Sequence, residues 1–171
     1  MEEHKHMITF KGEPLTLEGN LVREGDQAPD FTVVDNDLEE KKLSDYEGKI
    51  CVLVAVPSLD TGVCDAEARR FNKEAENFSD DVEVLTISMD LPFAQARWCG
   101  QADAKNVTTL SDHKAADFGE KYGVLIKELR LLSRTIFIVD KDRKVVYKQL
   151  VKEVTDEPDY DQVLESLNKL I

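Results

Sequence analysis

The sequence predicts an α/β fold with a mixed central sheet flanked by helices. Three observations lead to this prediction. Strand-like and helix-like segments alternate, one strand-like run is apolar without interruption, and two late strand-like segments are joined by a short turn-rich loop. A chain of 171 residues with 42% hydrophobic content is long enough to bury one core. Because no repeat, low-complexity tract or long linker interrupts it, we expect a single domain over residues 1–171.

The N-terminal region predicts a small β-hairpin that precedes the main pattern. Residues 8–10 and 14–17 have strand-like composition and flank a turn at residues 11–13, which contains Gly12. A further short apolar run at residues 31–34 follows a turn signal at residues 27–30. We therefore expect an N-terminal β-hairpin in addition to the central sheet.

The uninterrupted apolar run lies at residues 50–56 and is rich in valine. Such a run is typical of a strand that is buried on both faces. It ends at Pro57, and residues 62–78 then have an approximate apolar helical face among charged residues. Thr61 or Asp60 can cap the start of this helix.

The rest of the chain continues the alternation. We expect a strand at 82–88, a short helix at 92–99 with Pro92 in its first turn and Gly100 at its end, a strand at 107–110, a helix from Asp112 to about residue 122, paired strands at 135–139 and 144–150, and an amphipathic helix at 158–170. A thioredoxin-like fold fits this order of elements.

The charge of the chain excludes several classes of partner. A formal net charge of -13 without any cluster of lysine and arginine would repel phosphate backbones and anionic lipid, so we expect neither a nucleic acid nor a membrane as partner. No stretch approaches the roughly 20 apolar residues that span a bilayer. We therefore expect a soluble, cytoplasmic protein.

The three cysteines are too few and too odd in number for a secreted disulfide scaffold. Cys64 falls in the first turn of the expected helix, where unpaired backbone N–H groups and the helix macrodipole favour a thiolate. The alternative is that Cys64 is only a small buried hydrophobe. The acidic side chains of Asp60, Asp65 and Glu67 would oppose the thiolate if they faced it, so we expect a cation nearby.

The segment PSLDTGVCDAEARRFN contains the pattern P-x-x-x-T-x-x-C at Pro57, Thr61 and Cys64. This pattern is the signature of peroxiredoxins, and the segment resembles the active site of their bacterial thiol peroxidase subfamily. SMDLPFAQARWCG resembles the resolving-cysteine segment of that subfamily, LLSRTIFIVD its active-site arginine strand, KEVTDEPDYDQVL the start of its C-terminal helix and ITFKGEPLTLEG its hairpin. The resemblance covers nearly the whole chain.

The resemblance implies a role for each of five residues. Cys64 would be the peroxidatic cysteine, Thr61 would hydrogen-bond the thiolate and the incoming peroxide, Pro57 would shield the pocket, and Arg134 would be the cation. Cys99 would be the resolving cysteine, which forms an intrachain disulfide with Cys64. For two of these residues a simpler alternative exists, because Arg134 could form a surface ion pair and Thr61 could serve only as a helix cap.

The expected chemistry requires no metal or other cofactor. Hydroxyl, guanidinium and helix N–H donors suffice to stabilise the sulfur and the leaving oxygen. His4, His6 and His113 are scattered without the spacing of zinc ligands. Cys51 lies inside the valine-rich run and is expected to be inert.

Attack on a peroxide would leave Cys64 as a sulfenic acid, which a second thiol can convert to a disulfide. Cys99 lies 35 positions after Cys64 on a different expected helix. A disulfide requires Cα atoms within about 7 Å, so we expect local unwinding of one or both helices during turnover. Trp98, next to Cys99, is expected to have a packing role.

The sequence therefore predicts an antioxidant peroxidase that reduces hydrogen peroxide and organic hydroperoxides. The resemblance implies that thioredoxin or a similar dithiol regenerates it and that it is a homodimer. Two alternatives remain open, a thiol–disulfide exchange protein of the same fold and a redox sensor without rapid turnover. The absence of C-x-x-C and the presence of Thr61 and Arg134 favour the peroxidase over the exchange protein.

Overall fold

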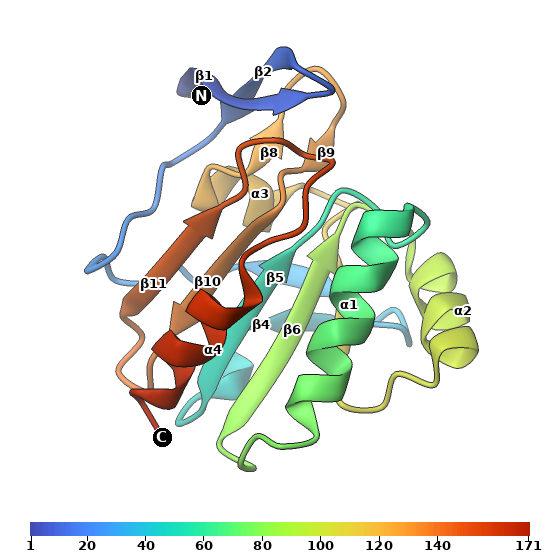
Figure 1. Ribbon diagram of the computed structural model, residues 1–171, viewed down its shortest axis with the longest axis vertical. Coiled ribbons are helices and arrows are strands. Elements are labelled where there is room, and N and C mark those ends of the chain that lie inside the picture. The colour runs from blue at the N-terminus through green and yellow to red at the C-terminus, as the bar shows by residue number, and fades with distance from the viewer.

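The computed structural model describes residues 1–171 and arranges them around a seven-stranded sheet (Figure 1). In sheet order its strands are β11 (Val145–Leu150), β10 (Thr135–Val139), β5 (Ile50–Ala55), β6 (Val82–Ser88), β7 (Thr108–Ser111), β3 (Thr32–Val34) and β4 (Glu40–Lys42). The pairs β5–β6 and β6–β7 are parallel, whereas β10 pairs antiparallel with both β5 and β11. The predicted mixed sheet and the late antiparallel pair are therefore confirmed.

Strand β5 lies near the middle of the sheet, and all six of its residues are buried. Its side chains alternate between two apolar clusters. Cys51, Leu53 and Ala55 pack into one cluster, and Val52 and Val54 pack into the other. Because neither face of the strand meets water, its sequence has no polar alternation.

Helices cover both faces of this sheet. On one face lie α1 (Gly62–Ala75), α2 (Pro92–Ala102) and α4 (Tyr160–Asn168), and on the other lie α3 (Asp117–Tyr122) and the 3-10 turn η1 (Leu43–Tyr46). Phe71 of α1, Trp98 of α2 and Val163 of α4 share a cluster, whereas Leu43 and Phe118 pack into the opposite one. None of the helices combines the length and the apolar character needed to cross a membrane.

The predicted N-terminal hairpin is confirmed, and it is part of a second sheet. Strands β1 (Glu3–Phe10) and β2 (Glu13–Glu18) pair antiparallel around Gly12, whose φ of 84° suits a tight turn. Strands β8 (Leu125–Ile126) and β9 (Leu131–Leu132) extend them to four strands. Two-residue strands are too short for a periodic pattern, which is why the sequence did not indicate them.

Helix α2 is longer than the sequence predicted. Gly100 was expected to end it, but the helix continues through Gly100 to Ala102. The end of the helix is at Asp103 instead, which adopts the left-handed conformation with φ of 51°. Asp is one of the few residues with a side chain that tolerate this conformation, so it replaces glycine as the C-terminal signal here.

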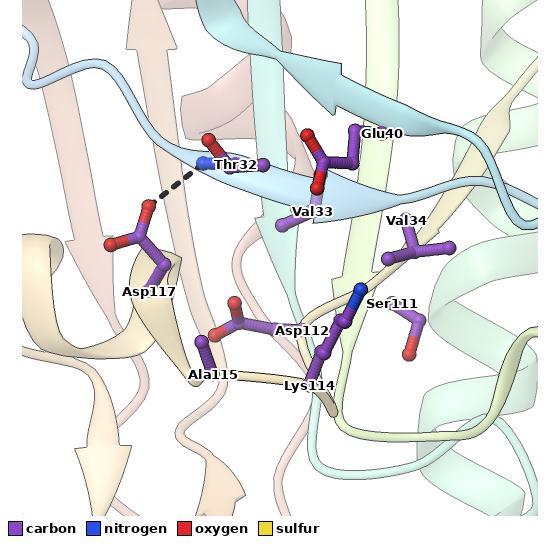
Figure 2. A pocket seen from close by; sticks show the side chains of 9 residues that line it. All are labelled: Thr32, Val33, Val34, Glu40, Ser111, Asp112, Lys114, Ala115 and Asp117. Carbon is purple, nitrogen blue, oxygen red and sulfur yellow. Dashed lines mark hydrogen bonds between the residues drawn. The ribbon is translucent and has the colours of Figure 1, made fainter.

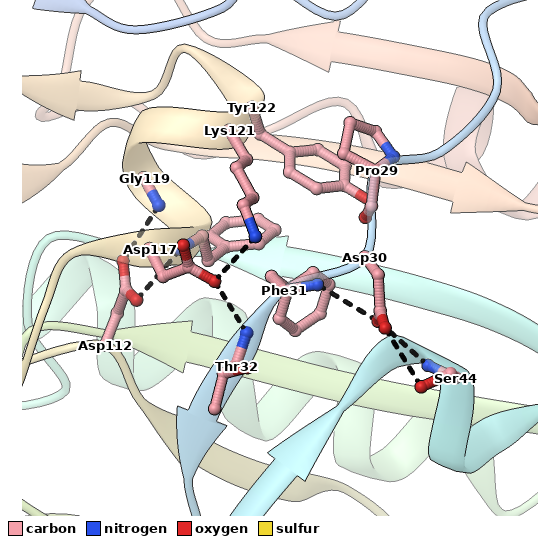
Figure 3. Close-up of polar contacts among 11 residues, drawn as sticks. Pro29, Asp30, Phe31, Thr32, Ser44, Asp112, Asp117, Gly119, Lys121 and Tyr122 are labelled. Atoms are coloured by element: carbon pink, nitrogen blue, oxygen red, sulfur yellow. Dashed lines mark hydrogen bonds and ion pairs between the residues drawn. The ribbon is translucent and has the colours of Figure 1, made fainter.

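The prediction that Asp112 opens a helix was wrong. Helix α3 begins only at Asp117, and the Asp112 carboxylate instead accepts hydrogen bonds from the backbone N–H groups of Phe118 (3.0 Å) and Gly119 (2.8 Å) (Figure 3). Asp112 thus binds the first turn of the helix from a loop that precedes it. Aspartate is a residue type that binds free N–H groups at a helix start, as the sequence indicated. However, the helix that Asp112 binds begins five residues later than predicted.

Candidate active site

Cys64 lies in the first turn of α1, and its side chain is completely buried. Thr61 is the N-cap, and its hydroxyl oxygen accepts a hydrogen bond from the Cys64 backbone N–H at 3.3 Å. The same hydroxyl donates to the backbone carbonyl of Ser58 at 3.0 Å. Of the two candidate caps, the structure therefore selects Thr61, which fixes the helix start that carries the cysteine.

Arg134 is the cation beside Cys64. Its Nη2 lies 3.3 Å from the Cys64 sulfur, and its Nη1 donates to the Glu67 carboxylate at 2.9 Å. Nε and Nη2 also donate to the Val154 carbonyl at 3.0 and 2.9 Å. With only 2% of its surface exposed, Arg134 does not form the surface ion pair considered as its alternative. Its planar fork is held by three different partners, which fixes its orientation towards the sulfur.

The sheet brings Arg134 to Cys64 across 70 positions of sequence. Arg134 immediately precedes β10, whose first residue, Thr135, lies opposite Ala55 at the end of β5. The loop from β5 to α1 begins at this same end of the sheet, with Pro57 inside it. Antiparallel pairing of β5 and β10 therefore places the guanidinium beside the start of α1.

Glu67 competes with Cys64 for the positive charge of Arg134. It is fully buried, and its Oε2 has no hydrogen-bond partner. Burial raises the pKa of Glu67 to about 7, although Arg134 acts in the opposite direction. Burial by itself would lower the pKa of Arg134, but Cys64 and Glu67 together raise it. A protonated Glu67 leaves the guanidinium charge to the Cys64 thiolate.

Replacing Glu67 with glutamine is expected to flatten the dependence of stability on pH. The pKa of Glu67 is higher in the folded protein, at about 7, than the ordinary value of 4.5 for a glutamate side chain. Its stabilising contribution is therefore complete below the lower value and is lost as the pH rises through the higher one. We expect the free energy of unfolding to fall in this window by up to about 1.4 kcal/mol per pH unit. Urea unfolding of the reduced proteins from pH 4.5 to 8 measures this, and equal slopes for both proteins would contradict it.

The other two acidic residues near the start of α1 do not contact the sulfur. The Asp65 carboxylate accepts hydrogen bonds from Trp98 Nε1 at 2.7 Å and from Arg69 Nε at 2.9 Å. Burial would raise the pKa of Asp65, but these two donors outweigh it and lower that pKa. Asp60 forms a wide ion pair with Arg97 at 3.6 Å. Both carboxylates are therefore paired with donors other than the Cys64 sulfur, so the opposition to a thiolate that the sequence raised does not arise from them.

A cavity of about 440 Å³ opens beside the buried cysteine. Pro57, Thr61 and Arg134, three of the predicted site residues, all line it. Apolar side chains complete its wall, among them Phe10 from the N-terminal hairpin and Leu129 from the segment between β8 and β9. The structure therefore gathers three of the five predicted residues around one space that is large enough to hold a small hydroperoxide, while the buried Cys64 lies behind its wall and contacts the lining residue Arg134.

Glu153 fastens the hairpin to the loop that holds Arg134. Its carboxylate accepts hydrogen bonds from the Thr9 hydroxyl (2.9 Å), the Gly12 backbone N–H (2.9 Å) and the Thr155 hydroxyl (2.7 Å). Donors from Thr155 and Gly12 hold the pKa of Glu153 well below its usual range. The next residue is Val154, whose carbonyl binds Arg134. Sequence reasoning missed this residue, because nothing distinguishes it from other acidic loop residues.

Cys99 lies in α2 and is partly exposed. Its sulfur contacts the Thr109 hydroxyl at 3.4 Å and the Asn36 side-chain amide at 3.9 Å. It lines a separate cavity of about 250 Å³ together with these two residues. Cys64 and Cys99 are both free thiols. The structure thus brings Arg134, Thr61 and Pro57 to Cys64, whereas Cys99 has a different set of neighbours.

Two other features take no part in this site. Cys51 is completely buried, and burial raises the pKa of its thiol, as the inert packing role would require. A cavity of about 240 Å³ lies between β3 and the loop before α3 (Figure 2). Its lining includes Thr32, Lys114 and Asp117, but none of the predicted site residues. The cavity of Figure 2 therefore lies apart from the predicted site residues.

Comparison with known proteins connects this geometry to a family. Residues 23–164 match the Redoxin family. The chain is 57% identical over 162 residues to the thiol peroxidase of Oceanobacillus iheyensis, covering 95% of this chain and 98% of that protein. It is 56% identical over 164 residues to the thiol peroxidase of Bacillus subtilis, covering 96% and 98%. A peroxiredoxin-like protein from Aquifex aeolicus superposes with a TM-score of 0.91 at 43% identity, covering 98% and 99%. The expected thioredoxin-like fold is confirmed by this similarity.

Proposed function

Because this chain belongs to the Redoxin family and is a thiol-dependent peroxidase, we propose that Cys64 is the thiol that attacks the peroxide and that Cys99 resolves the product. The contact of 3.3 Å between Arg134 Nη2 and the Cys64 sulfur carries the assignment of Cys64. Cys51 also contacts an arginine, Arg143 Nη1 at 3.9 Å, but it lies inside strand β5 and not at a helix start. The hydrogen-bond partners of the Cys99 sulfur are Asn36 and Thr109, and neither is a cation. A helix start beside an arginine is the site that favours a thiolate.

The proposed first step is an attack of the Cys64 thiolate on one peroxide oxygen. An S–O bond forms and the O–O bond breaks, so that the sulfur is oxidised to a sulfenic acid while the departing oxygen takes up a proton as water or an alcohol. Arg134 stabilises the sulfur and the charge that develops on the oxygens, since it stays protonated throughout. Thr61 supplies a hydroxyl at the cavity wall, and Pro57 shields the sulfur from water.

The proposed second step is a condensation between the Cys64 sulfenic acid and the Cys99 thiol. A disulfide forms and water leaves, after which a dithiol reductant restores both thiols. Each cysteine has its own hydrogen-bond partners, Arg134 for Cys64 and Asn36 and Thr109 for Cys99. A disulfide needs Cα atoms within about 7 Å, and we propose that local unwinding of the start of α1, the end of α2, or both brings the two cysteines together.

The finer features of the function belong to the same proposal. We infer that hydrogen peroxide and organic hydroperoxides are both substrates, and the apolar walls of the 440 Å³ cavity support the organic ones. Thioredoxin is the proposed reductant, and a single-domain protomer in a cytoplasmic homodimer is the proposed form. A reducing cytoplasm fits a chain whose three cysteines are too few and too odd in number for a disulfide scaffold.

Replacing Cys99 with serine is expected to stop turnover after one cycle. The variant should still consume one equivalent of peroxide, because Cys64 and Arg134 are unchanged, and then accumulate sulfenic acid or more oxidised forms of Cys64. Peroxide consumption per protein and the intact mass after one exposure measure this. Continued turnover with thioredoxin would remove Cys99 from the mechanism and leave the assignment of Cys64 intact.

A further inference from the structure

A single hydrogen bond joins helices α1 and α2, and it lies beside both cysteines. The indole Nε1 of Trp98 donates to Asp65 Oδ1 at 2.7 Å. Asp65 directly follows Cys64 in the chain, and Trp98 directly precedes Cys99. Any movement that brings the two sulfurs together therefore acts on this bond. We call it the Asp65–Trp98 bond.

The surroundings of this bond make it stronger than an ordinary surface contact. Trp98 is only 5% exposed, and its ring packs into the apolar cluster beneath α1 that contains Phe71 and Cys64. The acceptor is a carboxylate, and hydrogen bonds to charged groups are shorter and stronger than neutral ones. Asp65 also lies in the first turn of α1, where a negative charge is favoured by the helix macrodipole.

The two halves of α2 differ in how their side chains are bonded to the rest of the protein, and the second half is held more weakly. Gln95, in the first half, donates to the Ser88 hydroxyl at 3.0 Å and to the Leu110 carbonyl at 2.9 Å. From Arg97 onward, the side-chain interactions with the rest of the protein are the Trp98 bond, the weak contacts of the Cys99 sulfur and an exposed ion pair between Arg97 and Asp60 at 3.6 Å. The turn that carries Cys99 can therefore leave its place while Gln95 remains bound.

We propose that Asp65 and Trp98 are positioning residues that keep Cys99 away from Cys64 until the peroxide has been reduced, and that breaking their bond is a required step of disulfide formation. This proposal rests on the proposed roles of the two cysteines. The bond sets how long the Cys64 sulfenic acid persists before the thiol of Cys99 condenses with it. A second peroxide molecule competes in that interval and oxidises the same sulfur to a sulfinic acid. A weaker bond thus favours resolution over irreversible oxidation.

The test is a single-turnover experiment on the reduced full-length chain and two variants. Trp98→Phe removes the donor but keeps most of the ring, and Asp65→Asn keeps an acceptor without its charge. Rapid mixing with one equivalent of hydrogen peroxide, followed by acid quench and thiol labelling, gives the rate of disulfide formation. We expect this rate to rise about tenfold in Trp98→Phe and by a smaller factor in Asp65→Asn. The rate of the peroxide step should remain unchanged in both.

A second readout separates this role from simple loss of stability. At a fixed excess of peroxide, the fraction of Cys64 that becomes sulfinic acid should be lowest in Trp98→Phe, intermediate in Asp65→Asn and highest in the unmodified protein. Arg69→Ala removes only the other donor to Asp65 and should behave like the unmodified protein. Val145→Ala lowers stability in the apolar cluster on the opposite face of the sheet, and it should not accelerate the disulfide.

The outcomes are distinct. Equal rates in the unmodified protein and in Trp98→Phe would overturn the role of the Asp65–Trp98 bond, and so would an equal acceleration by Val145→Ala. Absence of any disulfide between Cys64 and Cys99 in the unmodified protein would instead overturn the proposed resolving step itself.

Discussion

Cys64→Ser is expected to abolish peroxidase activity, with a loss on the order of 10⁴-fold or more in the rate of peroxide consumption. A serine hydroxyl beside Arg134 cannot supply a thiolate, and none of the residues that line the adjoining cavity carries a thiol to replace it. The remaining donors would still bind a peroxide but would have no sulfur to stabilise. Stopped-flow mixing of the reduced variant with hydrogen peroxide measures the effect directly.

Cys51→Ala is the matched control for this loss. Cys51 is as completely buried as Cys64, but it packs into the opposite apolar cluster and pairs with Val139, at the end of β10 that is remote from Arg134. The variant should keep the rate of the unmodified protein and lose only some stability from the missing sulfur. Rapid peroxide reduction by Cys64→Ser, or its loss in Cys51→Ala, would show that the nucleophile has been wrongly assigned. A rate for unmodified Cys64 that matches an ordinary free thiol would contradict activation by Arg134.

The local part of the site could be predicted from the sequence because local rules determine it. An uninterrupted apolar run predicts a buried strand, a proline ends it, and a threonine three residues before the cysteine predicts a cap. The structure has β5, Pro57 and Thr61 in these roles, and Cys64 is in the first helical turn as expected. Resemblance to a family then pointed to Arg134, which no local rule connects with Cys64.

The rest of the site depends on contacts between distant segments. Glu67 was interpreted as a charge that would oppose the thiolate, but the register of β10 against β5 makes it a partner of Arg134. The Val154 carbonyl that orients Arg134 belongs to a loop without regular structure, so no periodic pattern marks it. The role of Glu153 also needs the folded hairpin, because two of its donors, Thr9 and Gly12, lie more than 140 positions away.

The same reasoning explains the errors at α2 and α3. The predictions that Gly100 ends a helix and that Asp112 begins one depended on residue type alone. The packing of Trp98 and the cap at Asp103 carry α2 past the glycine. The carboxylate of Asp112 reaches the helix N–H groups from outside the helix. Tertiary contacts therefore outweigh weak local signals wherever a short helix packs against the sheet.

Arg134→Met is expected to lower the rate of peroxide reduction by about 10²- to 10³-fold, the range typical of removing one preorganised donor at a developing charge. The thiolate of Cys64 would lose its nearest cation, and the departing oxygen would lose a donor. Arg134→Lys should fall between this variant and the unmodified protein. A lysine keeps the charge but cannot donate to Cys64, Glu67 and Val154 in one plane. Second-order rate constants from stopped-flow mixing provide the ranking, and full activity in Arg134→Met would contradict it.

The same substitution also has an effect on stability, and Glu67 makes that effect depend on pH. Without Arg134, the Glu67 carboxyl is buried with no partner, and breaking a buried ion pair in this way costs about 3–5 kcal/mol when the remaining group is charged. Arg134 lowers the pKa of Glu67, so this pKa should be higher still in Arg134→Met, and at pH values below it the carboxyl is protonated and the cost is smaller. The free energy of unfolding of Arg134→Met, measured with urea, should therefore keep decreasing as the pH rises above 7, where that of the unmodified protein levels off.

The double variant Glu67→Gln, Arg134→Met separates the stabilising and catalytic roles of the arginine. It should lose the steep pH dependence of the single variant, because no ionisable group remains in the buried pair. It should not regain peroxide reduction, because Cys64 still lacks its cation. If the double variant recovered both stability and activity, Arg134 would act only as a counter-ion for Glu67. If it recovers stability alone, the interaction of Arg134 with the Cys64 sulfur is the one that matters for catalysis.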